Sequence, residues 1–136
     1  LVPGKKGLSE NITVVSVVGR YLEHARIAYF RNGGAEELYL SSADWLPRNL
    51  ERRVELMFPV LDEGLRGRVH DILAAYFLDN VKAHRLGPTG AWRRVKPAED
   101  EAPYSAQAAF YEAVKRRRAL EEAPEEELQV RRRPST

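Results

Sequence analysis

Residues with side chains suited to phosphate chemistry are concentrated between positions 21 and 55 of this sequence. His24 precedes Arg26 by two residues, and the run SSADWLPRN (41–49) leads into Arg52, Arg53 and Glu55. Guanidinium groups present forked donors that match phosphate oxygens. An imidazole can donate a proton or a hydrogen bond to a phosphoryl group. The residue types in this stretch therefore indicate a phosphate site made of side chains.

A hairpin is the local structure expected to bring these groups together. Asn-Gly-Gly at 32–34 lies between two runs of alternating apolar residues, 27–29 and 38–40, and Asn-Gly favours the positive φ angles that a tight hairpin turn needs. We expect strands at about 26–30 and 37–41. Their open ends then carry the polar groups, which are His24, Arg26, Ser41, Ser42 and Asp44.

Each of these residues also has a purely structural interpretation. His24 could be a strand-edge histidine bonded to a backbone carbonyl. The arginines Arg48, Arg52 and Arg53 could form an exposed cluster paired with Glu51 and Glu55. Asp44 could orient a histidine or cap its own turn, and the cap is the expectation from the residues alone.

Other candidates are expected to be structural. Trp45 is expected in the core, and His70 and His84 are expected to be structural or solvated. The basic run 115–118 is expected on a solvated helix face, with contact to a polyanion as the alternative. The sequence has no GxxxxGK[ST] or GxGxxG loop and no paired-histidine metal spacing, so a bound phosphate has to be held by side chains.

Composition indicates a single globular domain. The 136 residues are 43% hydrophobic and 31% charged, with a net charge of +2 and no cysteine. The absence of cysteine excludes disulfides and thiolate metal sites. The small net charge gives no reason to expect that the protein binds nucleic acid. No apolar run approaches the roughly 18 residues of a membrane span. The chain begins with Leu1 and not with Met, so we expect a piece of a longer protein.

The remaining elements predict an α/β fold with a mixed β-sheet flanked by helices. A strand buried on both faces is expected at 12–18, a short connector at 20–24, and a loop or short helix at 43–50 with Pro47 in its first turn. A further strand is expected at 53–58, which would put Arg53 and Glu55 on one face so that one holds the other. Helices are expected from Asp62 to about 77 and over 105–122 with Ser105 as N-cap, and strands at 81–86 and 91–96. Charge blocks with little to bury predict disorder at 123–136, which leaves 1–122 as the folded domain.

The residues quoted so far resemble a known family. YLEHARIAYFRNGG (21–34), LYLSSADWLPRNLERRVELMFPV (38–60) and, more weakly, GAWRRVKP and APYSAQAAFY are similar to the C-terminal part of type 1 bacterial polyphosphate kinases. The resemblance runs from about residue 1 to 111. It implies a phospholipase D-like domain, the second of two that face each other around a shared site.

The resemblance also implies an activity and roles for residues. Such enzymes reversibly transfer the terminal phosphate of ATP to polyphosphate with Mg²⁺, through a phosphohistidine that would lie in the partner domain, outside this chain. His24 matches the second histidine, which contacts nucleotide phosphate and assists transfer. Arg53 and Glu55 match positions that line the phosphate tunnel, and Arg26 falls where phospholipase D enzymes carry the lysine of HxK.

The resemblance also implies binding partners and a cellular location, and two alternative functions remain. The expected partners are ATP or ADP, polyphosphate, the remaining domains of the same polypeptide and further copies in a homo-oligomer, with no nucleic acid; the Mg²⁺ ligands are expected outside this chain. A cytoplasmic location is expected, with peripheral membrane attachment as an alternative. Two other functions stay open, a phospholipase D-type phosphodiesterase and a non-catalytic polyanion-binding module.

Overall fold

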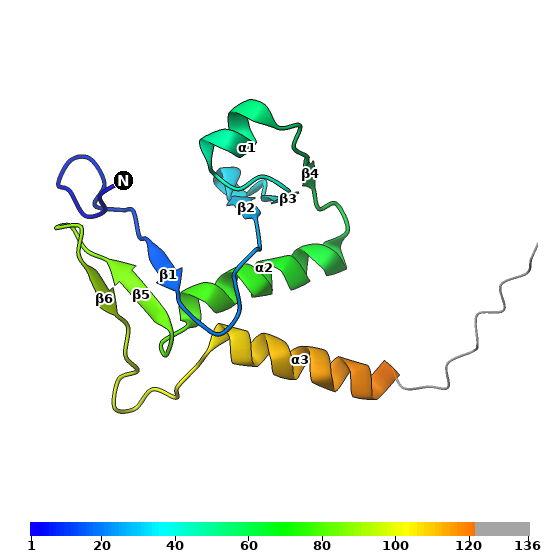
Figure 1. The fold of residues 1–136 in the computed structure, drawn as a ribbon. Coiled ribbons are helices and arrows are strands. Elements are labelled where there is room, and N and C mark those ends of the chain that lie inside the picture. The colour runs from blue at the N-terminus through cyan, green and yellow to red at the C-terminus, as the bar shows by residue number, and fades with distance from the viewer. Residues whose placement is uncertain (122–136) are drawn as a thin grey trace, which may run out of the picture.

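The computed structural model describes residues 1–121 of the chain (Figure 1). The predicted tail at 123–136 therefore lies outside the described residues. In chain order the elements are β1 (Val15–Val17), β2 (Ile27–Phe30), a 3-10 turn (Asn32–Gly34), β3 (Glu37–Ser41), α1 (Pro47–Arg52), β4 (Met57–Pro59), α2 (Glu63–Leu78), β5 (Ala83–Leu86), β6 (Trp92–Arg94) and α3 (Ala106–Glu121).

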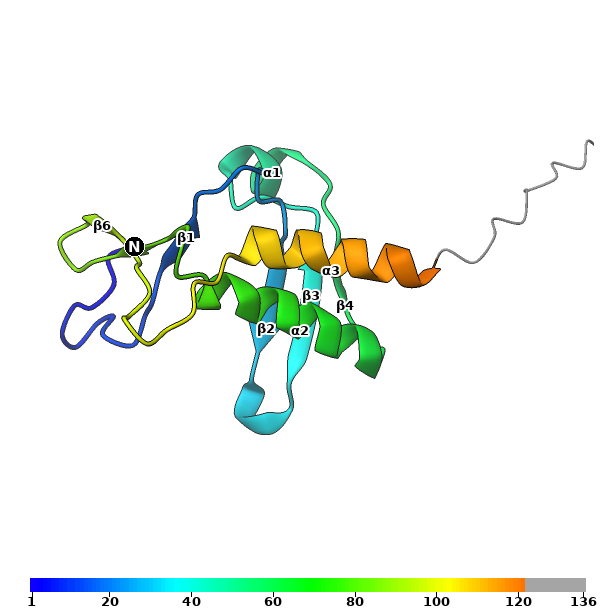
Figure 2. The same cartoon turned by 90° about the horizontal axis from the view of Figure 1, so that it is seen from below.

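The strands form two small antiparallel sheets. One has the order β1-β5-β6 and the other the order β2-β3-β4. Helix α2 contacts β1 of the first sheet and β2 of the second, and α3 lies beside α2 (Figures 1 and 2). The predicted α/β fold with flanking helices is confirmed, but the β-strands form two antiparallel sheets in place of the one mixed sheet expected, and α2 contacts both.

The predicted hairpin is confirmed with its turn. Strands β2 and β3 pair so that Ile27 faces Leu40 and Tyr29 faces Leu38. Between them Asn32 and Gly33 have φ angles of 42° and 65°, the left-handed conformation that asparagine and glycine adopt most readily. Leu38 is 4% exposed and anchors the hairpin in the core. The turn thus fixes the register that places Arg26 opposite the end of β3.

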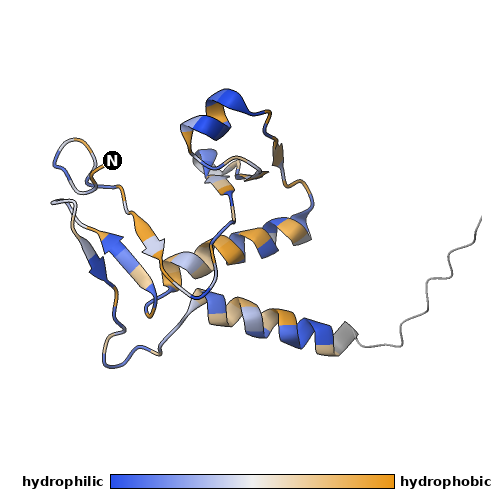
Figure 3. Ribbon diagram, in the orientation of Figure 1, coloured by the Kyte–Doolittle hydropathy of each residue, from blue (hydrophilic) through white to orange (hydrophobic). Residues whose placement is uncertain are grey.

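Helix α2 begins as the sequence predicts. Asp62 is its N-cap and accepts a hydrogen bond from the backbone N–H of Leu65 at 2.8 Å. Apolar residues recur along α2 in Figure 3, whereas α1 is largely hydrophilic. Among residues 1–121, no helix is both long enough and apolar enough to cross a membrane.

Ser105 directly precedes α3, as predicted for an N-cap residue, and its carbonyl accepts from the N–H of Ala109 at 2.9 Å. The first helical N–H, that of Ala106, donates to Oδ2 of Asp79 at 2.8 Å. Oδ1 of the same carboxylate accepts from the N–H groups of Val81, Lys82 and Ala83 at 3.0, 2.6 and 3.1 Å. The acceptor at the start of α3 is therefore a residue remote in sequence. Helix caps predicted from neighbouring residues do not include such an acceptor.

Asp79 is a buried carboxylate, only 2% exposed, and it remains ionised. Burial raises its pKa, but the backbone hydrogen bonds from Lys82, Ala106, Val81 and Ala83 outweigh burial and leave the pKa below its usual value. The adjacent Asn80 bonds the backbone of Tyr104 and Ala102. These two residues join the end of α2 to β5 and to the start of α3.

Four predicted strands are shorter than expected. The strand at 12–18 was expected to be buried on both faces, but β1 covers only Val15–Val17, whose residues are half-buried, and Val18 beyond its end is 62% exposed. The strand at 53–58 begins only at Met57. The connector at 20–24 forms no helical turn. The strands predicted at 81–86 and 91–96 are present as β5 (Ala83–Leu86) and β6 (Trp92–Arg94), each shorter than its predicted range.

Candidate functional site

The end of the β2–β3 pair brings His24, Arg26 and Asp44 together. The N–H of Ser41 donates to the carbonyl of Arg26 at 3.0 Å, which extends the pairing by one step beyond β2. The chain then turns, and the N–H of Ala43 donates to Oγ of Ser41 at 3.1 Å. This turn returns Asp44 to the side of Arg26. The predicted convergence at the open end of the hairpin is therefore observed for these three residues.

Arg26 is the centre of the cluster. Its Nε lies 2.8 Å and its terminal nitrogen 2.7 Å from Oδ1 of Asp44, and the same terminal nitrogen lies 3.0 Å from Nε2 of His24. A guanidinium only donates, so Nε2 of His24 must be the acceptor in this contact. The imidazole is then neutral and carries its proton on Nδ1. His24 is bonded to a side chain and not to the backbone carbonyl of the structural interpretation.

Asp44 is the anchor of this cluster. The hydrogen bond from Arg26 lowers the pKa of the carboxyl; partial burial opposes this, and the charge of Arg26 adds to the lowering. The carboxylate thus stays ionised and holds the guanidinium. Neither predicted role is observed: Asp44 acts on His24 through Arg26, and the backbone turn is closed by Ser41.

Asn49 is a site residue that sequence reasoning passed over. It lies in α1, is 3% exposed, and its side chain contributes a hydrogen bond to Asp44 that helps to lower the pKa of that carboxyl. Its Oδ1 has no partner among the described residues. A buried amide oxygen without a donor is uncommon. The signal was present in the sequence, since Asn49 closes the run SSADWLPRN that begins at Ser41.

The other two predicted phosphate ligands lie after α1. Glu55 accepts a short hydrogen bond from Oγ of Ser42, whose oxygen also accepts from the N–H of Leu56 at 3.0 Å. Arg53 is exposed, has extended backbone angles at the end of α1, and forms no ion pair with a described residue. Since neither residue lies within β4, the strand alternation that would pair Arg53 with Glu55 does not apply. Glu55 holds Ser42 instead.

Carboxylates near His24 are already engaged and do not offer a metal cage. Asp44 binds Arg26 and Glu55 binds Ser42. Among residues 1–121, no three His, Asp or Glu side chains are grouped so that they could hold a metal ion. Mg²⁺ binds oxygen ligands in near-octahedral geometry and commonly takes several from substrate phosphates and water. The described residues therefore do not fit a resident Mg²⁺.

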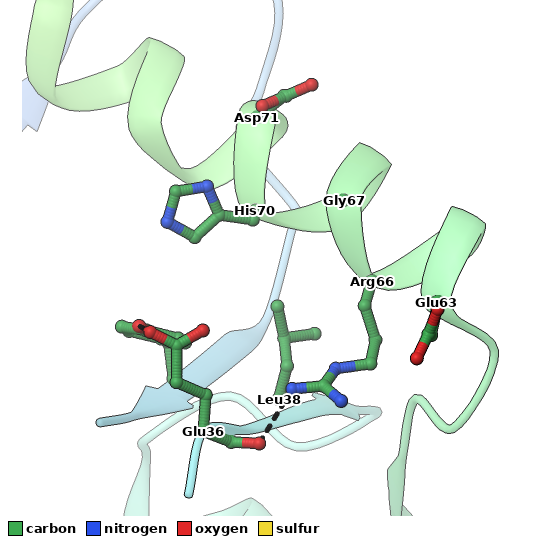
Figure 4. Close-up of a pocket in the computed structure, with 8 residues that line it drawn as sticks. Glu36, Leu38, Glu63, Arg66, Gly67, His70 and Asp71 are labelled. Atoms are coloured by element: carbon green, nitrogen blue, oxygen red, sulfur yellow. Dashed lines mark hydrogen bonds between the residues drawn. The ribbon is translucent and has the colours of Figure 1, made fainter. Parts of the chain in front are cut away.

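A separate polar cavity of about 460 Å³ lies between β2, β3 and α2 (Figure 4). In Figure 4, His70 and Arg66 project from α2 toward Glu36 and Leu38. Arg66 donates to the carbonyl of Glu36 at 2.7 Å, and the rings of His70 and Tyr29 pack edge to face with their centroids 5.5 Å apart. These contacts give His70 a structural role, as predicted, and the cavity contains none of the predicted phosphate ligands.

The remaining predictions have mixed outcomes. Trp45 was expected in the core, but it is 90% exposed because no described element covers the loop before α1. His84 is half-buried, and its Nδ1 lies 3.2 Å from the carbonyl of Lys82, in line with a structural role. The basic run 115–118 lies on an exposed part of α3, as predicted.

Comparison with known proteins covers nearly the whole chain. The sequence model of the family "Polyphosphate kinase C-terminal domain 2" matches residues 1–107. The chain is 49% identical over 133 residues to a polyphosphate kinase of Rhodopirellula baltica, covering 97% of this chain and 16% of that protein. It is 52% identical over 115 residues to a polyphosphate kinase of Xylella fastidiosa strain Temecula1, covering 84% of this chain and 16% of that protein.

A solved structure agrees with the sequence relatives. The crystal structure of polyphosphate kinase from Porphyromonas gingivalis superposes with a TM-score of 0.77 at 44% identity, covering 88% of this chain and 18% of that one. The chain thus spans about a sixth of the length of the proteins it matches. On the family match and these identities, the chain belongs to the family of polyphosphate kinase C-terminal domains.

Proposed function

We propose that this chain works as one domain of a polyphosphate kinase that reversibly transfers the terminal phosphate of ATP to inorganic polyphosphate. The observation that carries the proposal is the His24–Arg26–Asp44 cluster, in which an exposed imidazole and a guanidinium share one hydrogen bond. Such a pair of donors suits the oxygens of a transferring phosphoryl group, where positioning and charge stabilisation provide most of the catalysis.

Entry of a phosphate would exchange partners within this cluster. Nε2 of His24 now accepts a hydrogen bond from Arg26, so a phosphate oxygen that accepts this N–H in its place leaves the Nε2 lone pair free to take up a proton from solvent. The protonated imidazole then donates to a second phosphate oxygen and serves as general acid. Arg26 keeps its Nε bond to Asp44 during the exchange, because that bond uses a different nitrogen. In this proposal Asp44 fixes Arg26, and Arg26 presents the phosphate to His24.

Arg53 and Glu55 complete the proposed phosphate path. Arg53 is exposed and its guanidinium has no carboxylate partner among the described residues, so its charge is available to a polyanion. Glu55 acts indirectly in this proposal. Its bond to Ser42 ties the segment after α1 to the end of β3. The phosphohistidine implied by the resemblance would form on the partner domain of the same polypeptide.

The proposed partners are ATP or ADP, polyphosphate and the rest of a longer polypeptide, assembled as a homo-oligomer in the cytoplasm. Mg²⁺ would arrive with the nucleotide phosphates and take its protein ligands from outside this chain. The large apolar side chains left exposed around α1 and β4 support burial against further domains. They include Trp45 (90%), Leu50 (60%), Val54 (104%) and Leu61 (81%).

Replacement of His24 tests the proposal. In the longer polypeptide that carries this domain, we expect His24→Gln to lower ATP-dependent polyphosphate formation by about 10²–10⁴-fold, the range for loss of a general acid. His70→Gln is the matched control, because His70 lies in the separate cavity, and it should leave turnover unchanged. The measurement is incorporation of labelled γ-phosphate into acid-insoluble polymer. Unchanged turnover in His24→Gln would support a non-catalytic polyanion-binding module instead.

The 136-residue chain itself provides a second test. It should bind tripolyphosphate at the His24 cluster, observed as a change in the His24 imidazole signals by NMR, yet form no polyphosphate from ATP. Polyphosphate synthesis by this chain alone would contradict the proposal. The relatives reported above are named polyphosphate kinases and give no support to the phosphodiesterase alternative.

A further inference from the structure

The segment between β1 and β2, which carries His24, is fastened to both long helices. Gln107 of α3 bonds both backbone groups of Tyr21: its Oε1 accepts from the N–H at 3.1 Å, and its Nε2 donates to the carbonyl at 2.8 Å. The residues are 86 positions apart in sequence. One side-chain amide thus replaces the backbone partner that a neighbouring strand would supply.

Glu23 is the second point of attachment. Its Oε2 accepts from the hydroxyl of Tyr76 on α2 at 2.7 Å, and its Oε1 accepts from Nε2 of Gln107 on α3. Burial raises the pKa of the Tyr76 hydroxyl, and the hydrogen bond and charge of Glu23 raise it further, so the hydroxyl stays protonated and able to donate. Glu23 is therefore held by one donor from each helix.

Gly19 permits the close approach of Gln107. A methyl group built on Gly19 would overlap the side-chain amide of Gln107. Any larger residue would push that amide away from Tyr21. The close contact thus depends on the neighbouring side chain and not on the backbone angles of Gly19.

His24 is the residue next to Glu23 and faces the other way. Glu23 is half-buried against the helices, whereas His24 is exposed and meets Arg26. Fixing the Glu23 side chain and the Tyr21 backbone therefore limits where the imidazole can lie. Arg26 is held independently by Asp44 from the end of β3. The two halves of the cluster are thus positioned from different parts of the fold.

We infer that Gln107 and Tyr76 are positioning residues that hold the 19–24 segment so that the His24 imidazole meets the phosphate bound at Arg26. This inference rests on the proposed function. Displacement of a reacting group by about 1 Å can cost on the order of 10²-fold in rate. Neither residue touches the phosphate in this proposal, so their loss should affect the chemical step more than nucleotide binding.

Two substitutions of different severity test the inference in the longer polypeptide. Gln107→Met keeps the side-chain length but removes all of its hydrogen bonds, and Tyr76→Phe removes only one hydroxyl. We expect kcat to fall at least about tenfold in Gln107→Met and severalfold in Tyr76→Phe, with KM for ATP within about twofold. Glu112→Ala, an exposed change on the same helix, is the control and should alter neither.

Gly19→Ala provides an independent test through the steric contact. We expect Gly19→Ala to lower kcat as Gln107→Met does, because the new methyl group displaces the amide. In Gly19→Ala/Gln107→Ala the overlap is gone, so the double variant should be no worse than Gln107→Ala. Additive losses would show that Gly19 acts in another way and would overturn this part of the inference.

NMR of the 136-residue chain separates failure of the inference from failure of the proposed function. If tripolyphosphate does not change the His24 signals of the unaltered chain, the proposed phosphate site is wrong. If it does, Gln107→Met should reduce that change to less than about half, while circular dichroism shows that the variant remains folded. An unreduced change in folded Gln107→Met, or an unchanged kcat, overturns the positioning role alone.

Discussion

Replacement of Asp79 should be the most destabilising polar substitution in the described part of this chain. Asp79→Ala leaves four backbone N–H groups, those of Val81, Lys82, Ala83 and Ala106, without their acceptor. Ala83 and Ala106 are 1% and 0% exposed, so water cannot take the place of the carboxylate there. At about 1–3 kcal/mol for each buried unsatisfied donor, these two alone cost about 4 kcal/mol. This is a large share of the ~5–15 kcal/mol that stabilises a typical domain.

Asp79→Asn should be milder for a reason that the geometry supplies. The amide oxygen can still accept from the three donors that Oδ1 serves, but the amide nitrogen then faces the N–H of Ala106. The hydrogen bond from Ala106 is lost, and the remaining three bonds are made to a neutral oxygen and no longer to a charged one. We expect this to lower the free energy of unfolding by about 2 kcal/mol. Asp100→Asn, an exposed change in the linker before α3, should stay within about 0.5 kcal/mol.

Urea denaturation followed by far-UV circular dichroism measures these differences. With an m-value of about 2 kcal/mol per M, the midpoint should fall by about 2 M in Asp79→Ala and about 1 M in Asp79→Asn. A loss of less than about 1 kcal/mol in Asp79→Ala would refute the reasoning. It would mean that the four donors find other acceptors, so that Asp79 does not join α2, β5 and α3.

The pH dependence of stability provides a further check on Asp79. Its folded-state pKa lies below the usual value, so the unfolded chain takes up its proton first as pH falls. The stabilisation is therefore complete above about pH 4, near the unfolded pKa, and is lost as pH falls toward the lower folded value. In Asp79→Asn the free energy of unfolding should therefore decrease less as the pH falls below about 4. Asp44 has a lowered pKa as well, so some loss should remain.

Three further outcomes are expected. Gly33→Ala should cost about 1–2 kcal/mol in urea denaturation, because φ at Gly33 is 65°, and an equal stability would argue against this turn. Arg26→Lys should lower polyphosphate formation by at least about tenfold, since lysine has no second nitrogen to hold Asp44 while the first donates to phosphate; full activity would show that the forked contact is dispensable. Trp45→Ser should change the stability of the 136-residue chain by less than about 0.5 kcal/mol, and a larger loss would mean that Trp45 is covered.

Local chemistry made much of this protein predictable from sequence. The Asn-Gly turn requires positive φ at adjacent residues, so it specified the hairpin and its register. Asp62 capped α2 as expected, because a cap depends on residues within one helical turn. The convergence of His24, Arg26 and Asp44 followed from the same hairpin. The residue types in turn indicated phosphate, and the resemblance supplied the family.

Interactions between distant residues were beyond that reasoning. Trp45 is as apolar as a core residue, and only the arrangement of the elements shows that the described chain leaves it exposed. The exposure of Arg53 depends on where α1 ends. Glu55 precedes β4, which starts at Met57, and it accepts a hydrogen bond from Ser42 and not from Arg53. The ends of such helices and strands depend on which of several possible hydrogen bonds forms, and residue propensities do not predict this.

The sequence by itself determined which groups can do chemistry here and the hairpin that collects them, because both depend on residues close along the chain. The tertiary structure alone decided what holds them in place. Asp79 caps a helix 27 residues away, and Gln107 fastens a loop 86 residues away. Either contact exists only after α2 and α3 have packed side by side, since a polar side chain takes whichever partner the folded chain brings within reach.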